Sequence, residues 1–293
     1  MSWILFTLIS AIIFALANIF DKYILTKLVK NPVIPTIVWG IAGLIFGIVI
    51  FIFKGFPALS YLNMLLAFIS SILWITGAFL YFKALQLEEV SRVIALIYLT
   101  PLFVLILATI FLGEIFTLPK YIGILLLVLG AAIISLKNLR KFAFGNAFWL
   151  IIFANLAFAV SGIIIKYLLN FADFWTIFSY VKIGVGIATI PLFYFTYKEL
   201  IAISKQNRRV LWIIFIPQLS SLGAELLSII AVSISYVSLV SALSSVQPFF
   251  VLLFTLMLSI FHPKILEEEI GKSTLALKFF AIILIFVGGF LVI

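Results

Sequence analysis

Apolar runs long enough to cross a lipid bilayer recur along this chain from one end to the other. A helix needs about 20 mostly apolar residues to span the hydrocarbon core, whereas membrane β-strands are shorter and alternate in polarity. The chain is 66% hydrophobic and only 10% charged, so its 293 residues cannot cover a water-facing surface. We therefore predict an all-α integral protein of the cell (plasma) membrane with ten transmembrane helices. The predicted spans are 3–24, 33–53, 62–85, 90–112, 118–136, 147–169, 174–197, 211–233, 236–261 and 275–293.

The basic residues of this chain point to lipid headgroups rather than to nucleic acid. The formal net charge is +9, but the lysines and arginines are scattered singly or in short groups between apolar runs. Such positions are typical of residues that anchor helix ends near anionic lipid. The chain has no cysteine and no HExxH, GxSxG or P-loop motif. We therefore expect no enzyme activity, no cofactor, no metal and no nucleic acid. The expected partners are the lipid bilayer and a small-molecule substrate.

Two sequence matches indicate that the chain is a duplicated unit. VIALIYLTPLFVL at 93–105 aligns with VSALSSVQPFFVL at 240–252, and both segments contain a central proline. Lys22-Tyr23 recurs as Lys166-Tyr167 at nearly the same separation. Because each half holds five spans, an odd number, the second copy must insert upside down, as in transporters whose substrate site lies near the midplane between inverted repeats. The two predicted units cover residues 1–143 and 146–293.

One stretch resembles a known family. FLYFKALQLEEVSRVIALIYLTPLFVLILATIFLGEIFTLPKYIGILLLVLGAAIIS at 79–135 is similar to the EamA type of the drug/metabolite transporter superfamily. The matching pieces are Ala84-Leu85, a polar break, the proline-centred span, Leu112-Gly113-Glu114 and a closing span with glycine. The second half departs from this pattern, because it reads LSIFHPKILEEEIGK where a second Leu-Gly-Glu would stand. The resemblance implies two inverted five-helix bundles around a central cavity, and secondary transport of small metabolites, amino acids or drug-like molecules.

Glu225, in LSSLGAELLSII, is a carboxylate in the middle of an apolar span. Such a charge costs about 2.5–3.5 kcal/mol unless it is protonated, paired or facing water. Lys182, in FSYVKIGVG, is the matching anomaly in the neighbouring span, and both residues lie about 12–14 Å from the same membrane face. Antiparallel neighbours could therefore set the ammonium against the carboxylate. The pair could be purely structural, or it could be a substrate-binding or proton-coupling site.

Two prolines occupy matching positions in the fourth and ninth predicted spans. Inside a helix, Pro101 and Pro248 would each remove one backbone hydrogen bond and free a carbonyl group at midplane depth. Such groups can bind substrate or permit gating, although a plain packing kink also fits the sequence. Tyr98 and Gln247 stand close to these prolines. Because an unpaired amide is costly in lipid, we expect both residues to face the cavity.

The remaining candidates are aromatic and amide side chains. Trp74 and Tyr81 share one face of the third span, too deep for the interfacial aromatic belt. They could wall the cavity for a planar or cationic substrate, or they could fill the core as many of the 32 phenylalanines must. Asn18 and Asn155 lie in the first span of each half and are candidates to line the cavity. Glu114 is expected to cap a helix junction.

These features predict an exporter of small metabolites, such as amino acids or drug-like compounds, that works by alternating access with protons as a candidate coupling ion. The alternative is a flippase for lipid or lipid-linked sugar, in which Lys22 and Lys166 could contact headgroups; otherwise both would snorkel to the interface. A non-transporting scaffold is disfavoured by the buried charge. A monomer and a homodimer are both compatible with the sequence. The positive-inside rule places both chain ends outside, whereas members of the family that this chain resembles usually keep both inside.

Overall fold

Every regular element that the structure describes is a helix. The computed structural model describes residues 2–29, 31–55, 57–87, 93, 96–135, 146–206, 208–261 and 272–293. In chain order the helices are α1 (Ser2–Tyr23), the π-helix η1 (Ile24–Leu28), α2 (Val33–Phe53), α3 (Tyr61–Leu87), α5 (Thr100–Leu112), α6 (Leu118–Ser135), α7 (Asn146–Leu168), α8 (Phe174–Ala188), α9 (Ile190–Gln206), α10 (Arg208–Ile234), α11 (Val237–Ser244), α12 (Gln247–Phe261) and α13 (Lys272–Val292). The all-α prediction is confirmed for these residues.

The described helices make this chain a multi-pass membrane protein. Six candidate spans are long and apolar enough to cross a bilayer, and a seventh results if α8 and α9, which meet at a bend of 58°, are counted as one. The predicted start of the fourth span at 90 and the boundary between the two units, at 143–146, fall mostly outside the described residues.

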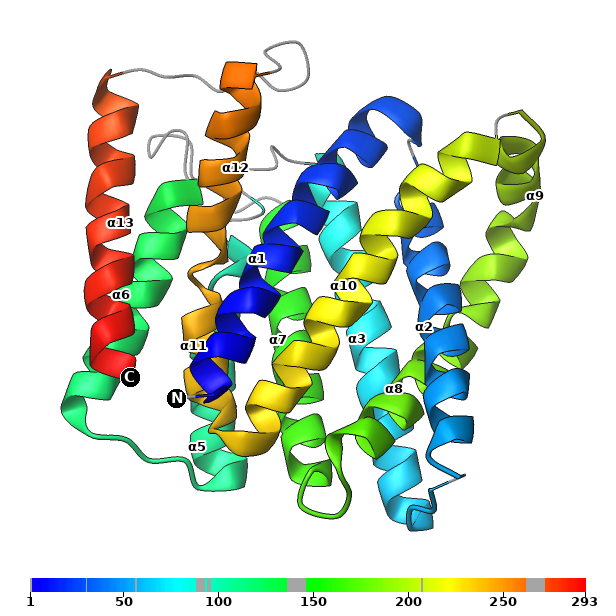
Figure 1. Ribbon diagram of the computed structural model, residues 1–293, viewed down its shortest axis with the longest axis horizontal. Helices are drawn as coiled ribbons and strands as arrows, with labels where there is room; N and C mark the ends of the chain where they lie inside the picture. The colour runs from blue at the N-terminus through cyan, green and yellow to red at the C-terminus, as the bar shows by residue number, and fades with distance from the viewer. Residues whose placement is uncertain are drawn as a thin grey trace.

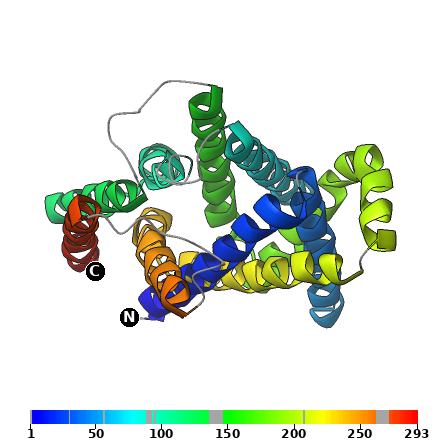
Figure 2. The same cartoon turned by 90° about the horizontal axis from the view of Figure 1, so that it is seen from above.

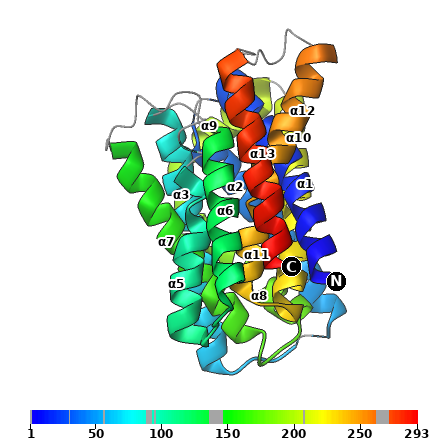
Figure 3. The same ribbon diagram turned by 90° about the vertical axis from the view of Figure 1, so that its left-hand side faces the viewer.

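The helices form a bundle that is longer in one direction. Figure 1 shows α6 and α13 at one end, and α2, α8 and α9 at the other. Seen from above, α1 and α10 lie on one side of the bundle, whereas α3 and α7 lie on the opposite side (Figure 2). Figure 3 shows α6 and α13 running side by side. The space between the α1–α10 pair and the α3–α7 pair is where the candidate site lies.

Glycines let two helix pairs approach closely. A Cβ atom on Gly288 of α13 would lie 2.7 Å from the carbonyl oxygen of Gly123 on α6, whereas one on the adjacent Gly289 would meet nothing within 4 Å. A Cβ atom on Gly47 of α2 would lie 2.9 Å from the Cβ atom of Lys182 on α8. Small residues at such contacts are typical of packed helices in membranes. The second contact fixes the position of Lys182.

The two proline-centred spans are broken rather than kinked. Pro101 is the second residue of α5, and Pro248 is the second residue of α12. At the start of a helix the missing N–H has no intrahelical partner to lose. The prediction that each proline kinks a continuous helix is therefore wrong. Each proline instead lies at the start of a new helical segment that follows a break.

The two breaks have the same backbone hydrogen bonds. In the first, the Leu99 N–H donates to the carbonyl of Leu96, at 3.1 Å. In the second, the Val246 N–H donates to the carbonyl of Leu243, also at 3.1 Å. These residues occupy equivalent positions in the two segments that match in sequence.

The junction between α10 and α11 is capped by two charged side chains. Glu114, which is 3% exposed, accepts hydrogen bonds from the first two N–H groups of α11, at 2.9 and 3.1 Å. Lys166 donates to the carbonyls of Val232 and Ser235, at 2.8 and 2.6 Å. The predicted capping role of Glu114 is confirmed. The expectation that Lys166 snorkels is wrong, because its ammonium is satisfied by the end of α10.

Asp173 caps the start of α8, outside the membrane-spanning segment. Its carboxylate accepts from the backbone N–H groups of Trp175 and Thr176, at 3.0 and 3.3 Å, and lies 3.2 Å from the Lys54 ammonium. Partial burial opposes ionisation, but the hydrogen bonds from Thr176 and the nearby Lys54 outweigh it and lower the pKa of Asp173.

Candidate functional site

A cavity of about 400 Å³ lies between helices from both halves of the chain. Its walls come from α1, α2, α3, α5, α7, α10, α11 and α12, together with residues just before α5. This volume is within the range of small-molecule sites, which is about 300–1,000 Å³.

One wall of the cavity is a polar stripe on α10. Gln218, Ser221, Glu225 and Ser228 all line the cavity and follow one another at three- and four-residue spacing. That spacing places them on one face of a helix. The opposite, lipid-facing side of α10 is exposed at Ser220. The sequence therefore contained the signal for this wall.

The break between α11 and α12 supplies a second polar surface. Ser241, Ser244, Ser245 and Gln247 line the cavity there. Ser245 is 1% exposed, and its hydroxyl has no hydrogen-bond partner among the described residues. An unpaired buried hydroxyl is unusual in a folded protein. Within the described part of the chain, Ser245 thus lacks the hydrogen bond that a buried hydroxyl normally makes.

The third surface is aromatic. Trp39 of α2 and Trp74 of α3 stack with their ring centroids 4.0 Å apart, and Phe158 of α7 meets Trp74 edge-on at 5.4 Å. Tyr81 and Tyr98 extend this surface. The cavity is thus polar on two sides and aromatic on the third, which suits a molecule that has both an apolar body and polar ends.

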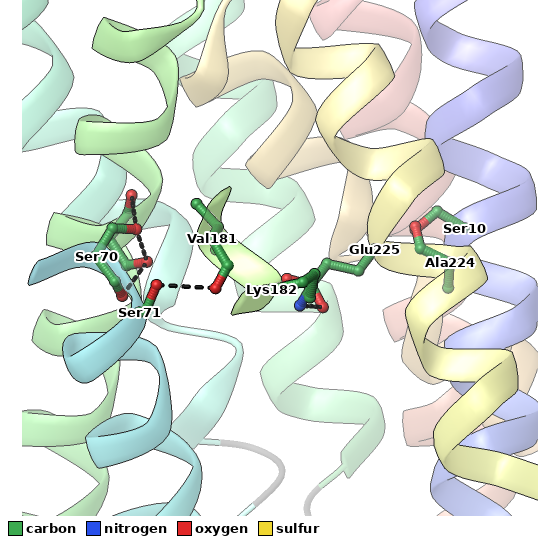
Figure 4. Close-up of polar contacts among 8 residues, drawn as sticks. Ser10, Ser70, Ser71, Val181, Lys182, Ala224 and Glu225 are labelled. Atoms are coloured by element: carbon green, nitrogen blue, oxygen red, sulfur yellow. Dashed lines mark hydrogen bonds and ion pairs between the residues drawn. The ribbon is translucent and has the colours of Figure 1, made fainter. Parts of the chain in front are cut away.

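Lys182 of α8 and Glu225 of α10 form the ion pair that the sequence predicted. The Lys182 ammonium hydrogen-bonds Glu225 Oε2 (Figure 4) and lies 4.1 Å from the ring centroid of Trp39 and 5.4 Å from that of Trp74. Glu225 is 7% exposed, and its Oε1 has no hydrogen-bond partner among the described residues. Lys182 itself is fully buried and does not line the cavity. The structure thus places Lys182 behind Glu225 as its counter-ion.

Serine hydroxyls from neighbouring helices hold both partners of the pair in place. Ser71 of α3 donates to the carbonyl of Val181, at 2.9 Å, and Ser10 of α1 donates to the carbonyl of Ala224, at 2.7 Å (Figure 4). Each acceptor is the residue directly before a charged partner. These bonds fix the register of α8 against α3 and of α10 against α1.

Asp21 is a cavity residue that the sequence did not single out. Its Oδ1 accepts a hydrogen bond from Gln218 Nε2, at 2.7 Å, and both residues line the cavity. Asp21 stands near the end of α1, where a carboxylate normally indicates contact with water at the interface. Gln218 follows Pro217, a proline inside α10. The sequence signals were the scarcity of aspartate, at positions 21 and 173, and that interior proline.

The structure brings most of the predicted site residues to one cavity but excludes three. Those that line it are Asn18, Trp74, Tyr81, Tyr98, Pro101, Glu225 and Gln247; those that do not are Lys182, Asn155 and Pro248. Asn155 is fully buried, its Nδ2 donates to the carbonyl of Leu96 and its Oδ1 accepts from Thr100, both at 2.9 Å. The expectation that Asn155 lines the cavity is wrong, because its amide satisfies the backbone at the first break. Among the described residues no group of three His, Cys, Asp or Glu lies together to hold a metal.

Comparisons with known proteins identify relatives of this chain. The model of the EamA-like transporter family matches residues 1–136. An uncharacterized protein of Methanocaldococcus jannaschii is 30% identical over 136 residues, which cover 46% of this chain and 97% of that protein. A protein known from its crystal structure superposes with a TM-score of 0.68 at 16% identity, over 99% of this chain and 96% of that one. At this identity the similarity concerns the fold alone.

Proposed function

Because this chain belongs to the EamA-like transporter family, we propose that it is a secondary transporter that exports small metabolites, such as amino acids or drug-like compounds, by alternating access. The observation that carries the proposal is the cavity of about 400 Å³, which is walled by helices of both halves and is polar on two sides and aromatic on the third. A scaffold has no need of such a polar cavity within lipid, where unpaired polar groups are costly.

The proposed architecture is ten transmembrane helices in two inverted units, 1–143 and 146–293. Seven candidate spans, counting the bent pair as one, and the three shorter apolar helices Thr100–Leu112, Leu118–Ile133 and Lys278–Val292 add up to ten. The equal hydrogen bonds at the two breaks support the duplication. The protein of Methanocaldococcus jannaschii matches 46% of this chain, and that match covers 97% of its own length. A relative of that size also supports a repeating unit half as long as this chain.

In this mechanism the breaks before α5 and α12 serve as the flexible points of each half. Discontinuous helices in transporters commonly expose backbone and side-chain polar groups at the substrate site. Ser245, whose hydroxyl has no hydrogen-bond partner in the described part of the chain, lies at the second break. Rocking of the two halves around the cavity would open it to one membrane face at a time.

Protons are the proposed coupling ion, and Glu225 is the proposed carrier. Glu225 lines the cavity; its Oε1 has no hydrogen-bond partner among the described residues, whereas its Oε2 is held by Lys182. A proton or a substrate donor can therefore bind the carboxylate without first displacing Lys182. Under this mechanism a Glu225→Gln variant transports without pH dependence.

The proposal is tested with purified protein in proteoliposomes. Uptake of a panel of amino acids is measured with and without a pH gradient, and the cavity is then blocked. Ser221→Phe fills the cavity from α10 and is expected to abolish transport, whereas Ser220→Phe on the lipid-facing side of the same helix is the matched control. Equal transport by both variants would rule out the cavity as the pathway.

One observation weighs against the alternative that the protein is a lipid flippase. Lys166, which could have contacted lipid headgroups, donates instead to two carbonyls at the end of α10. The side chain of Lys22 lies outside the described residues. Scrambling of fluorescent phospholipids by the same proteoliposomes, without movement of soluble solutes, would favour the flippase instead.

A further inference from the structure

We propose that Asp21 recognises the ammonium group of an organic amine, so that the cavity selects amines over anions and over neutral molecules of the same shape. This inference rests on the proposed transport function and specifies its substrate class. It starts from the charges around the cavity. Two carboxylates line it, Asp21 and Glu225, and no basic side chain of the described residues does.

The two carboxylates differ in what neutralises them. Glu225 is paired with the ammonium of Lys182. Asp21 accepts from the neutral amide of Gln218, and in the described part of the chain no cation is paired with it. Asp21 is partly exposed, so its carboxylate is accessible from the cavity. A carboxylate in such surroundings is stabilised by a cation, by a proton or by water, and the described residues supply no cation.

The aromatic surface does not offer an equally good site for a second ammonium. The Lys182 ammonium already lies 4.1 Å from the ring centroid of Trp39 and 5.4 Å from that of Trp74, so a second cation at these rings would be repelled by a like charge. Trp74 stacks on Trp39 and is therefore covered on one side. Of the two carboxylates that line the cavity, Asp21 is the one that no cation of the described residues neutralises.

The far end of the cavity offers hydrogen-bonding groups. Gln218, which holds Asp21, and Glu225 are two turns apart on one face of α10, or about 10 Å along the helix. Glu225 and Ser245 both line the cavity, and neither Glu225 Oε1 nor the Ser245 hydroxyl has a hydrogen-bond partner among the described residues. A ligand with an ammonium at one end, an apolar ring in the middle and a hydroxyl at the other end satisfies both ends. Tyramine is the simplest molecule with these three parts.

The same reasoning disfavours free amino acids. Their carboxylate lies next to the ammonium and would approach Asp21, where no basic side chain of the described residues lines the cavity to receive it. The substrate class is therefore the amine rather than the zwitterion. This narrows the range of solutes that the proposed function allows.

The test is binding of radiolabelled tyramine to the purified full chain in lipid nanodiscs at neutral pH. Unlabelled tyramine, tyrosol and 3-(4-hydroxyphenyl)propionate compete, because they share the phenol and differ in the charge of the other end. We expect saturable binding, with tyrosol and the propionate competing about 10- to 100-fold more weakly, the range expected for loss of a charged hydrogen bond. Absence of tyramine binding, or equal competition by all three, overturns the proposal without any mutant.

Variants then assign the effect to Asp21. Asp21→Asn keeps the hydrogen bond to Gln218 but removes the charge, and it is expected to weaken tyramine binding by the same factor. Asp173→Asn changes the other aspartate, which lies outside the cavity, and is expected to bind like the unaltered protein. If both variants lose tyramine affinity equally, or if Asp21→Asn loses none, Asp21 is not the group that binds the ammonium. If the protein transports an amino acid but does not bind tyramine, this inference is refuted and the proposed function stands. If it binds tyramine through Asp21 but transports no solute, the proposed function is refuted and the binding site stands.

Discussion

Removal of one partner of the Lys182–Glu225 pair should destabilise the protein far more than removal of both. In Lys182→Met the Glu225 carboxylate loses the one partner that it has among the described residues, and breaking a buried pair in this way costs about 3–5 kcal/mol. In Glu225→Gln the ammonium keeps its contacts with Trp39 and Trp74, which offset about 1–2 kcal/mol. We therefore expect about 2–3 kcal/mol for Glu225→Gln. The double variant should unfold close to the original stability, because Met and Gln preserve the packing without leaving an unpaired charge.

The free energy of unfolding is measured in mixed micelles with increasing sodium dodecyl sulfate, followed by tryptophan fluorescence. The control cycle uses the exposed pair of Lys54 and Asp173, whose side chains are 39% and 45% exposed. Lys54→Met and Asp173→Asn should show a coupling energy below about 1 kcal/mol. If the double variant loses as much free energy of unfolding as the two single variants added together, the two side chains do not act as a pair and this account is refuted.

Three further predictions concern packing and caps. Gly288→Ala should destabilise the contact between α6 and α13 by about 1–3 kcal/mol, because its Cβ atom would lie 2.7 Å from a backbone oxygen. Gly289→Ala should cause no such loss, because its Cβ atom would meet nothing within 4 Å. Thermal unfolding of the two variants compares their stability. Asp173→Ala should cost about 1 kcal/mol near neutral pH. Because the folded pKa of Asp173 is lowered, its contribution is present above its ordinary pKa of 3.8 and is lost as the pH falls through the folded value, so the difference from the original protein should shrink in acid. Glu114→Gln should lower the free energy of unfolding by about 1.5–3 kcal/mol, because one N–H of α11 loses a charged acceptor. Amide hydrogen exchange at the start of α11 should then be faster. Unchanged exchange would contradict the capping role.

The contact between Lys182 and Glu225 could be predicted because helix geometry is regular. Both spans have a fixed rise per residue, so the positions of the two residues along the chain fixed their depths. The polar stripe on α10 followed the same logic, since three- and four-residue spacing defines one helix face. Properties of this kind depend on a single helix and its immediate neighbour, and sequence alone carries them.

Properties that depend on how helices cross were not predictable. Asp21 is near the end of an apolar run, and only the crossing of α1 over α10 brings it to Gln218 and the cavity. Asn155 could equally have faced the cavity, but its amide donates to the Leu96 carbonyl at the first break. The two prolines were recognised as a matching pair, yet a proline within an apolar run does not reveal whether the preceding helix continues to it. Pro101 illustrates this, because a turn ends the helix before it.

The serine bonds around the ion pair have a consequence for the integrity of the chain. Ser10 binds α10, Ser71 binds α8, and Ser70 exchanges hydrogen bonds with Ser161 of α7, so each contact joins an early helix to a late one. Glu114 likewise holds the start of α11. A fragment that ended in the connection between α6 and α7 would remove the α10 acceptor of Ser10, the α7 partner of Ser70 and the α11 donors of Glu114, and would leave Ser71 only its acceptor within α3. The segments on either side of that connection are therefore held together by buried hydrogen bonds.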